Sequence, residues 1–92
     1  METRLLKYFL AIALEESITR AALSLNITQP TLSRQMIGFE RQLGVTLFIR
    51  NKNKILLTAE GAFLKKRAQE IIDIISRTEI EISDLSKALK AE

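Results

Sequence analysis

The sequence contains no cysteine and no histidine. Without thiols the chain cannot form disulfides or thiolate metal sites, and without imidazole it lacks the commonest metal ligand and general base. Three glycines cannot build a glycine-rich phosphate loop, and the acidic residues are scattered rather than spaced as metal ligands. Aromatic residues make up 5% of the chain, too few for the stacking platforms that bind RNA. The composition therefore argues against catalysis, a metal or other cofactor, and RNA binding.

Long hydrophobic runs are also missing. No apolar segment approaches the about 20 residues of a membrane-spanning helix, and the first residues lack the layout of a signal peptide. We therefore expect no membrane partner and a cytoplasmic location. With 92 residues, 47% of them hydrophobic, the chain has room for one small domain with a modest core.

The charges are unevenly distributed along the chain. The net charge of +3 divides into +4 over residues 1–58 and −1 over residues 59–92. Between Thr28 and Thr58 five cations stand against one anion, Glu40. Such a region is either an ordinary solvated basic face or a phosphate-binding surface, and charge alone does not decide between them.

Two helices are predicted at the start of the chain. Leu5, Phe9 and Ile12 recur at helical spacing and predict a helix over residues 3–15, which we expect to be core scaffold. Ser17 is a suitable N-cap for a second helix that runs to about residue 25.

The next segment predicts a turn and a third helix. Asn26 tolerates the left-handed conformation that ends a helix, Thr28 is a good N-cap, and Pro30 is acceptable in a first helical turn. The third helix should run from about Gln29 to its C-cap at Gly44. Its apolar stripe, which should face the core, consists of Leu32, Met36, Phe39 and Leu43. Helix-turn-helix DNA-binding motifs have this anatomy and place the first residues of their second helix on base edges.

Residues 45–58 change from helical to strand-like character. Residues 45–50 and 55–58 are β-prone runs, and the polar residues 51–54 between them have the length of a hairpin loop. A two-stranded ribbon after a helix-turn-helix predicts a winged domain.

A long helix is predicted from its N-cap Thr58 towards the end of the chain. About 30 residues at about 1.5 Å each make a rod of roughly 45 Å, which a head of residues 1–58 cannot cover. We therefore expect a winged helix-turn-helix domain over 1–58 and a coiled-coil linker helix over 59–92 that forms a homodimer. The predicted dimer seam repeats at alternating spacings of 4 and 3 and comprises Leu64, Ala68, Ile71, Ile75, Thr78, Ile82, Leu85 and Leu89.

The segments QPTLSRQ at 29–35 and LGVTLF at 43–48 resemble the N-terminal domain of the LysR-type transcriptional regulators. The resemblance begins at Leu5 and covers nearly the whole chain. It implies a mainly α, winged helix-turn-helix regulator of bacterial transcription that binds double-stranded DNA sequence-specifically. Its dimer would contact an inverted-repeat operator with the third helix in the major groove. Nucleoid association, and a higher oligomer in a longer protein, are also implied.

The chain departs from the family pattern at a few positions. Glu16 replaces a usual glycine, Ile49 a usual acidic residue, and Ile37 a usual polar residue. Gly38, inside the third helix, either is a tolerated weakness or allows a phosphate to approach the backbone closely. Family members continue beyond this linker helix into an effector-binding domain, so we expect a DNA-binding fragment, with a naturally short protein as the alternative.

Candidate base-contacting residues lie at the start of the third helix. Gln can pair with adenine, Arg with guanine, and the Thr methyl group can meet the thymine methyl group. Alternatively, the glutamine only starts the helix and the arginine contacts only phosphate. These candidates are Gln29, Pro30, Thr31 and Arg34. Candidates for phosphate or wing contacts are Arg20, Thr28, Ser33, Arg50, Lys52 and Lys54. A pure dimerisation or adaptor module is the remaining alternative, and salt-dependent binding to duplex DNA would separate the two.

Overall fold

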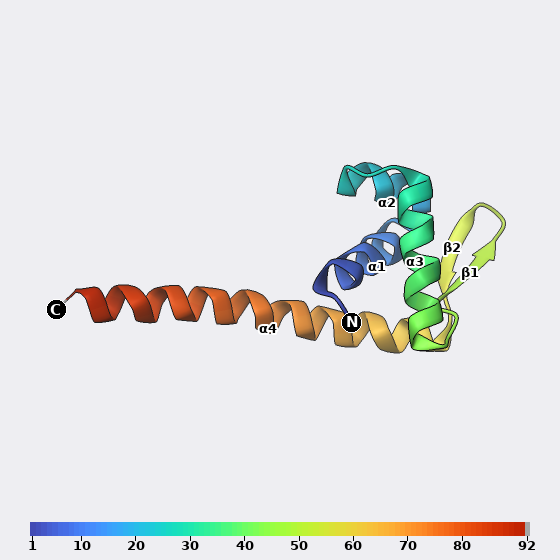
Figure 1. The fold of residues 1–92 in the computed structure, drawn as a ribbon. Helices are drawn as coiled ribbons and strands as arrows, with labels where there is room; N and C mark the ends of the chain where they lie inside the picture. The colour runs from blue at the N-terminus through green and yellow to red at the C-terminus, as the bar shows by residue number, and fades with distance from the viewer. Residues whose placement is uncertain (92) are drawn as a thin grey trace.

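Three helices and a two-stranded sheet form a head, and a fourth helix projects from it as a rod (Figure 1). The computed structural model describes residues 1–91. The elements are α1 (Thr3–Glu15), α2 (Ile18–Leu25), α3 (Gln29–Leu43), β1 (Phe48–Asn51), β2 (Lys54–Leu57) and α4 (Ala59–Lys90). The molecule measures 60 × 26 × 20 Å along its principal axes. The predicted architecture, a mainly helical winged helix-turn-helix followed by a long helix, is confirmed.

Side-chain caps determine where three of the helices begin. Ser17, Thr28 and Thr58 each accept a hydrogen bond from the backbone N–H three residues later, at 3.1, 3.3 and 2.9 Å. Left-handed residues end the helices before the turns: Asn26 (φ 59°) ends α2 and Gly44 (φ 72°) ends α3. The caps predicted from the sequence are therefore confirmed.

The core lies where α1 meets α2, α3, the wing and the first turns of α4. The rings of Phe9 and Phe48 lie 5.3 Å apart and join α1 to β1. No polar or charged residue is buried among residues 1–91. The buried residues are Leu5, Leu6, Phe9, Ile12, Ala21, Ala22, Leu32, Met36, Phe39, Leu47, Ile55, Leu64 and Ala68.

The wing is an antiparallel hairpin that is tighter than the sequence predicts. Asn51 pairs with Lys54, so the turn contains only Lys52 and Asn53, and Lys52 adopts a left-handed φ of 54°. The prediction of strands over 45–50 and 55–58, joined by a loop over 51–54, was therefore wrong in its boundaries.

Residues 45–47 do not enter the sheet because their backbone groups bond elsewhere. The Val45 N–H donates to the Glu40 carbonyl oxygen at 3.2 Å, and the Leu47 carbonyl oxygen accepts from the Thr58 N–H at 3.0 Å. These β-prone residues thus connect the end of α3 to the start of α4 instead of extending β1.

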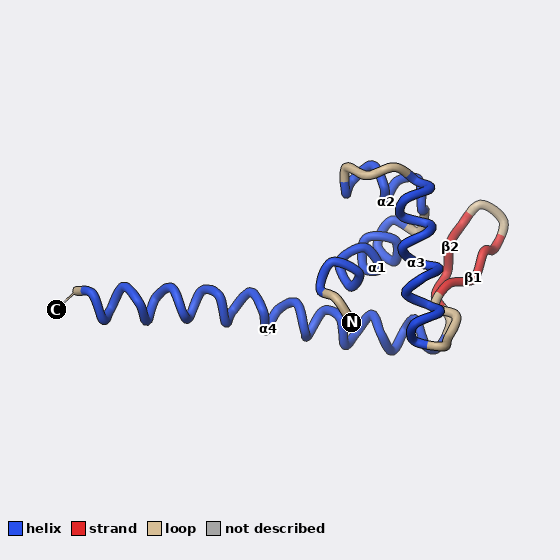
Figure 2. Tube along the Cα trace, viewed as in Figure 1, coloured by secondary structure: helices blue, strands red, loops and turns tan. Residues whose placement is uncertain are grey.

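The first half of α4 packs on the head, and its second half extends away from every other element (Figure 2). Leu64 (8% exposed) and Ala68 (0% exposed) belong to the core of the head. This leaves these two predicted seam residues no free surface for a second chain. The rest of the predicted seam, from Ile71 to Leu89, lies beyond them. No helix within residues 1–91 is both long and apolar enough to cross a membrane.

Candidate nucleic-acid interface

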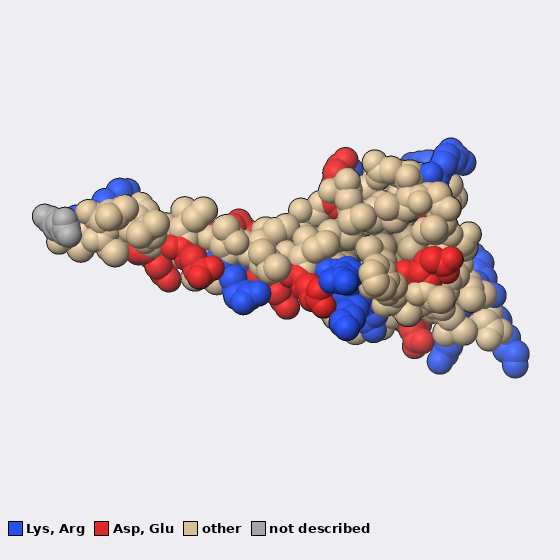
Figure 3. Space-filling model, turned by 90° about the horizontal axis from the view of Figure 1, so that it is seen from below, with Lys and Arg blue, Asp and Glu red and all other residues tan. Residues whose placement is uncertain are grey.

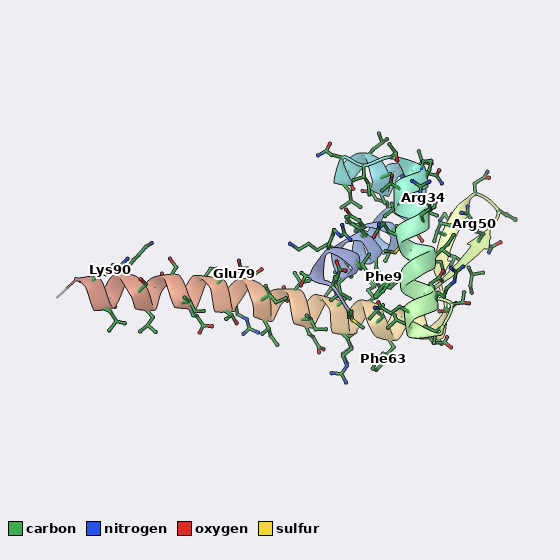
Figure 4. The ribbon with its side chains drawn as sticks, in the orientation of Figure 1. Phe9, Arg34, Arg50, Phe63, Glu79 and Lys90 are labelled. Atoms are coloured by element: carbon green, nitrogen blue, oxygen red, sulfur yellow. The ribbon has the colours of Figure 1, made fainter. Side chains whose placement is uncertain are left out.

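One side of α3 is open to solvent. At about 100° per residue, Pro30, Arg34, Ile37 and Arg41 share the helix side opposite the buried stripe, and all four are exposed. Figure 4 shows Arg34 on α3, at the end of the molecule far from the distal part of α4. The face predicted to meet DNA is therefore accessible in the folded chain.

Polar side chains at the start of α3 are paired with one another. The Gln29 Nε2 donates to the Ser33 Oγ at 3.1 Å, and the Thr28 Oγ1 donates to the Thr31 Oγ1 at 2.7 Å. These contacts are at or near the surface, so an incoming ligand can replace them with its own donors and acceptors. They bring four of the predicted contact residues, Thr28, Gln29, Thr31 and Ser33, together at the start of the helix.

A cleft of about 210 Å³ separates the start of α3 from the wing. It is bordered by the first residues of α2, by Gln29 and by cationic side chains of the wing. The N-terminus of α2 adds backbone N–H groups and the positive end of a helix dipole, which favour an anion. The wing residues that line the cleft are Arg50, Lys52, Asn53, Lys54 and Ile55.

The predicted cationic contacts differ in their surroundings. The Arg20 Nη2 donates to the Glu15 carbonyl oxygen at 2.7 Å, and the Lys54 Nζ lies 4.0 Å from the Glu16 Oε1. Within residues 1–91, Arg34, Arg50 and Lys52 form no ion pair, and all three side chains are exposed. These three are the cations most readily available to phosphate.

The only anion between Thr28 and Thr58 is bonded to a backbone amide of the head. The Glu40 carboxylate is half-buried and accepts a 2.6 Å hydrogen bond from the Leu47 N–H. The structural role of this charge was not predicted from the sequence; the available signal was its isolation in a basic stretch at the end of a helix. Figure 3 shows Lys and Arg side chains along the edge of the head far from the tip of α4, and mixed charges along the rod. No group of acidic side chains within residues 1–91 could hold a metal ion.

An exposed polar face on the second helix of a helix-turn-helix, flanked by a cationic wing, defines a winged helix-turn-helix of the nucleic-acid-binding class. A family model described as "Bacterial regulatory helix-turn-helix protein, lysR family" matches residues 3–62, and the chain belongs to this family.

Curated and solved relatives agree with this assignment. The HTH-type transcriptional regulator BsdA of Bacillus subtilis (strain 168) is 48% identical over 88 residues, which are 95% of this chain and 30% of BsdA. A crystal structure of BenM_DBD with catB site 1 DNA has a TM-score of 0.90 at 35% identity, covering 94% of this chain and 96% of that one. A CbnR_DBD–DNA complex has a TM-score of 0.89 at 36% identity, covering 94% and 99%.

The chain spans about 30% of the length of BsdA. It corresponds to the helix-turn-helix domain of a LysR-family transcription regulator.

Proposed function

We propose that this chain is the operator-binding part of its regulator. It binds double-stranded DNA sequence-specifically, with α3 in the major groove and the wing against the neighbouring backbone. The proposal rests on one observation: cations of α3 and the wing are exposed to solvent, whereas the one anion of this region is hydrogen-bonded to the backbone. Arg34, Arg50 and Lys52 are exposed without ion pairs within residues 1–91, whereas Glu40 is bonded inward to the Leu47 amide. The result is a cationic face on the very elements that such folds apply to DNA.

Base readout falls to the first turns of α3. Gln29 and Arg34 carry side chains that pair bidentately with adenine and guanine, and the Thr31 methyl group suits the thymine methyl group. Pro30 fixes the backbone of the first turn of α3 and so helps to shape the surface that faces the bases. The Gln29–Ser33 hydrogen bond of 3.1 Å orients the glutamine amide before DNA arrives.

Phosphate contacts surround this readout region. Hydroxyl groups at Thr28 and Ser33 and cations at Arg50, Lys52 and Lys54 position the domain without reading sequence. Arg20 can join them only by leaving the Glu15 carbonyl oxygen, to which it now donates at 2.7 Å. We therefore rank Arg20 below the wing residues.

The linker helix supplies the second half of the function. Its exposed apolar side chains continue well beyond the head, and pairing with a second copy would cover them. Two heads held in this way match an inverted-repeat operator. Residues 1–58 then act as the DNA-binding domain and 59–92 as the dimerising linker, in the cytoplasm at the bacterial nucleoid. The seam residues with surface available for this are Ile71, Ile75, Thr78, Ile82, Leu85 and Leu89.

The test is binding of the 92-residue chain to duplexes selected from a random library, followed by fluorescence anisotropy at several salt concentrations. Arg34→Ala should cost about 1–3 kcal/mol on the selected duplex and reduce discrimination among bases. Lys52→Ala should weaken all duplexes about equally and lower the salt slope. Lys87→Ala, on the distal part of α4, is the matched control and should leave binding unchanged.

A dimerisation or adaptor module remains the second candidate, because the exposed stripe of α4 alone would serve it. If the chain is such a module, it should select no duplex from the library, and its binding to duplex DNA should not depend on salt. That outcome would overturn the proposal, whereas an equal loss on all sequences for Arg34→Ala would reassign that arginine to phosphate.

A further inference from the structure

Ile37 is a large apolar side chain in the middle of the exposed side of α3. It is 53% exposed. At about 100° per residue it lies one turn beyond Ser33 and about one turn before Arg41. Its side chain is therefore not required to fill the core, yet it occupies the face that the proposed function applies to DNA.

Two surface hollows lie beside Ile37. One hollow of about 220 Å³, between α3 and β1, is bordered by Ser33, Ile37 and Arg50. A second hollow, of about 680 Å³, is bordered by Ile37 and Arg41. Ile37, Glu40 and Thr46 border both hollows, and each hollow also has an arginine on its rim.

The chemistry of the major groove restricts which group of a base can contact Ile37 favourably. Base edges there present hydrogen-bonding groups, and among the four bases only thymine adds a methyl group, at C5. Isoleucine offers no donor or acceptor, so a polar edge covered by it loses water without gaining a partner. A thymine methyl group, in contrast, gains apolar burial against the same side chain.

We propose that Ile37 is a specificity-determining residue that selects thymine through its C5 methyl group at the base pair facing the middle of α3. The proposal rests on the proposed function, because it requires α3 to lie in the major groove. It adds an apolar contact to the polar readout of Gln29 and Arg34. Contact with deoxyribose carbons is the competing interpretation, and it would not distinguish one base from another.

The experiment begins with selection from a random duplex library by wild type and by Ile37→Ala. Wild type should require thymine at one position where Ile37→Ala shows no preference. In the selected duplex, deoxyuridine at that position should weaken wild-type binding about fourfold, the equivalent of burying one methyl group. Ile37→Ala should bind both duplexes equally. A 5-methylcytosine at that position should bind wild type more tightly than cytosine does.

Ile80→Ala is the matched control, because it removes the same side chain, 60% exposed, from the part of α4 beyond the head. It should keep the full deoxyuridine penalty at the Ile37 position. Since Ile37 is exposed, Ile37→Ala should unfold at the wild-type temperature, which circular dichroism checks. If wild type selects no duplex, the proposed function fails. If wild type selects a duplex but deoxyuridine has no effect, or Ile37→Ala keeps the penalty, this proposal alone is overturned.

Discussion

The backbone N–H of Leu47 donates a 2.6 Å hydrogen bond to the carboxylate of Glu40. The carbonyl oxygen of Glu40 also accepts from the N–H groups of Gly44 and Val45, at 2.8 and 3.2 Å. One residue in the last turns of α3 therefore holds both the end of that helix and the segment that leads into β1. This arrangement fixes the wing relative to the helix that we propose reads DNA.

Glu40→Ala should lower the free energy of unfolding by about 1–3 kcal/mol, because the amide of buried Leu47 loses its charged acceptor. Urea denaturation followed by circular dichroism measures the loss. Glu40→Gln keeps an oxygen acceptor at this position and should lose less. Equal stability of wild type and both variants would show that water replaces the carboxylate at no cost.

Glu16→Gly should stabilise the head by about 1 kcal/mol. Glu16 ends α1 in the left-handed region at φ 54°, where a side chain costs about 1–2 kcal/mol that glycine avoids. Its carbonyl oxygen accepts from the Ile55 N–H at 3.0 Å, so this conformation connects the end of α1 to strand β2 of the wing. The contact of Glu16 with Lys54 is exposed and adds little.

The control for this prediction is Glu16→Ala. Alanine removes the same carboxylate but keeps a Cβ, so it should give no gain in the urea midpoint. A gain of similar size in both variants would assign the effect to charge and not to backbone conformation.

Gly61→Ala should destabilise the chain by about 1–3 kcal/mol, because a side chain here overpacks the core. A Cβ at Gly61 would overlap the carbonyl oxygen of Leu47, which already accepts from the Thr58 N–H at 3.0 Å. The Leu47 carbonyl group and the Thr58 N–H group belong to the backbone. Neither can move without shifting the junction of α3, the wing and α4. Thermal unfolding of the variant measures the effect.

Gly38→Ala is the matched control within another helix. A Cβ at Gly38 meets nothing within 4 Å, so the variant should be about 1 kcal/mol more stable. Its affinity for DNA then separates the two interpretations of this glycine. Unchanged affinity indicates a tolerated weakness, whereas a loss in the more stable variant indicates that a phosphate approaches the backbone closely.

Local signals in the sequence predicted the helices well. The caps at Ser17, Thr28 and Thr58 depend on residues three apart, so the chain itself contains the whole pattern. The start of β1 was not predictable in this way. Residues 45–47 are β-prone, but the bonds that hold them come from Glu40 and Thr58, which only the folded structure brings to them.

The same limit applies to the candidate site and to the linker. Heptad spacing assigned Leu64 and Ala68 to the dimer seam together with Ile82. Periodicity alone does not tell whether an apolar stripe packs on its own head or on a second chain. Residue type grouped Arg20 with Arg50 and Lys52 as candidate phosphate contacts. The structure separates them, since Arg20 donates to the Glu15 carbonyl oxygen at 2.7 Å.

The linker helix offers a test of dimerisation that leaves the head intact. Ile82 and Ile80 are 63% and 60% exposed, and both lie on the part of α4 beyond the head. They are separated by about 200° around the helix axis. Ile82 shares its side of the helix with Ile71, Leu85 and Leu89, whereas Ile80 lies opposite. The two isoleucines therefore differ in which face they occupy and not in exposure.

Ile82→Asp should convert a dimer into a folded monomer, because pairing would bury a carboxylate in an apolar seam. Ile80→Asp should leave the dimer unchanged, since its side chain would stay in water. Sedimentation equilibrium at micromolar concentrations measures the association, and circular dichroism should show a helical head in both variants. Operator binding by Ile82→Asp should weaken strongly, because two half-sites are then bound by separate heads. Dissociation by Ile80→Asp, or a wild type that is monomeric at high concentration yet binds both half-sites tightly, would contradict the assignment of the seam.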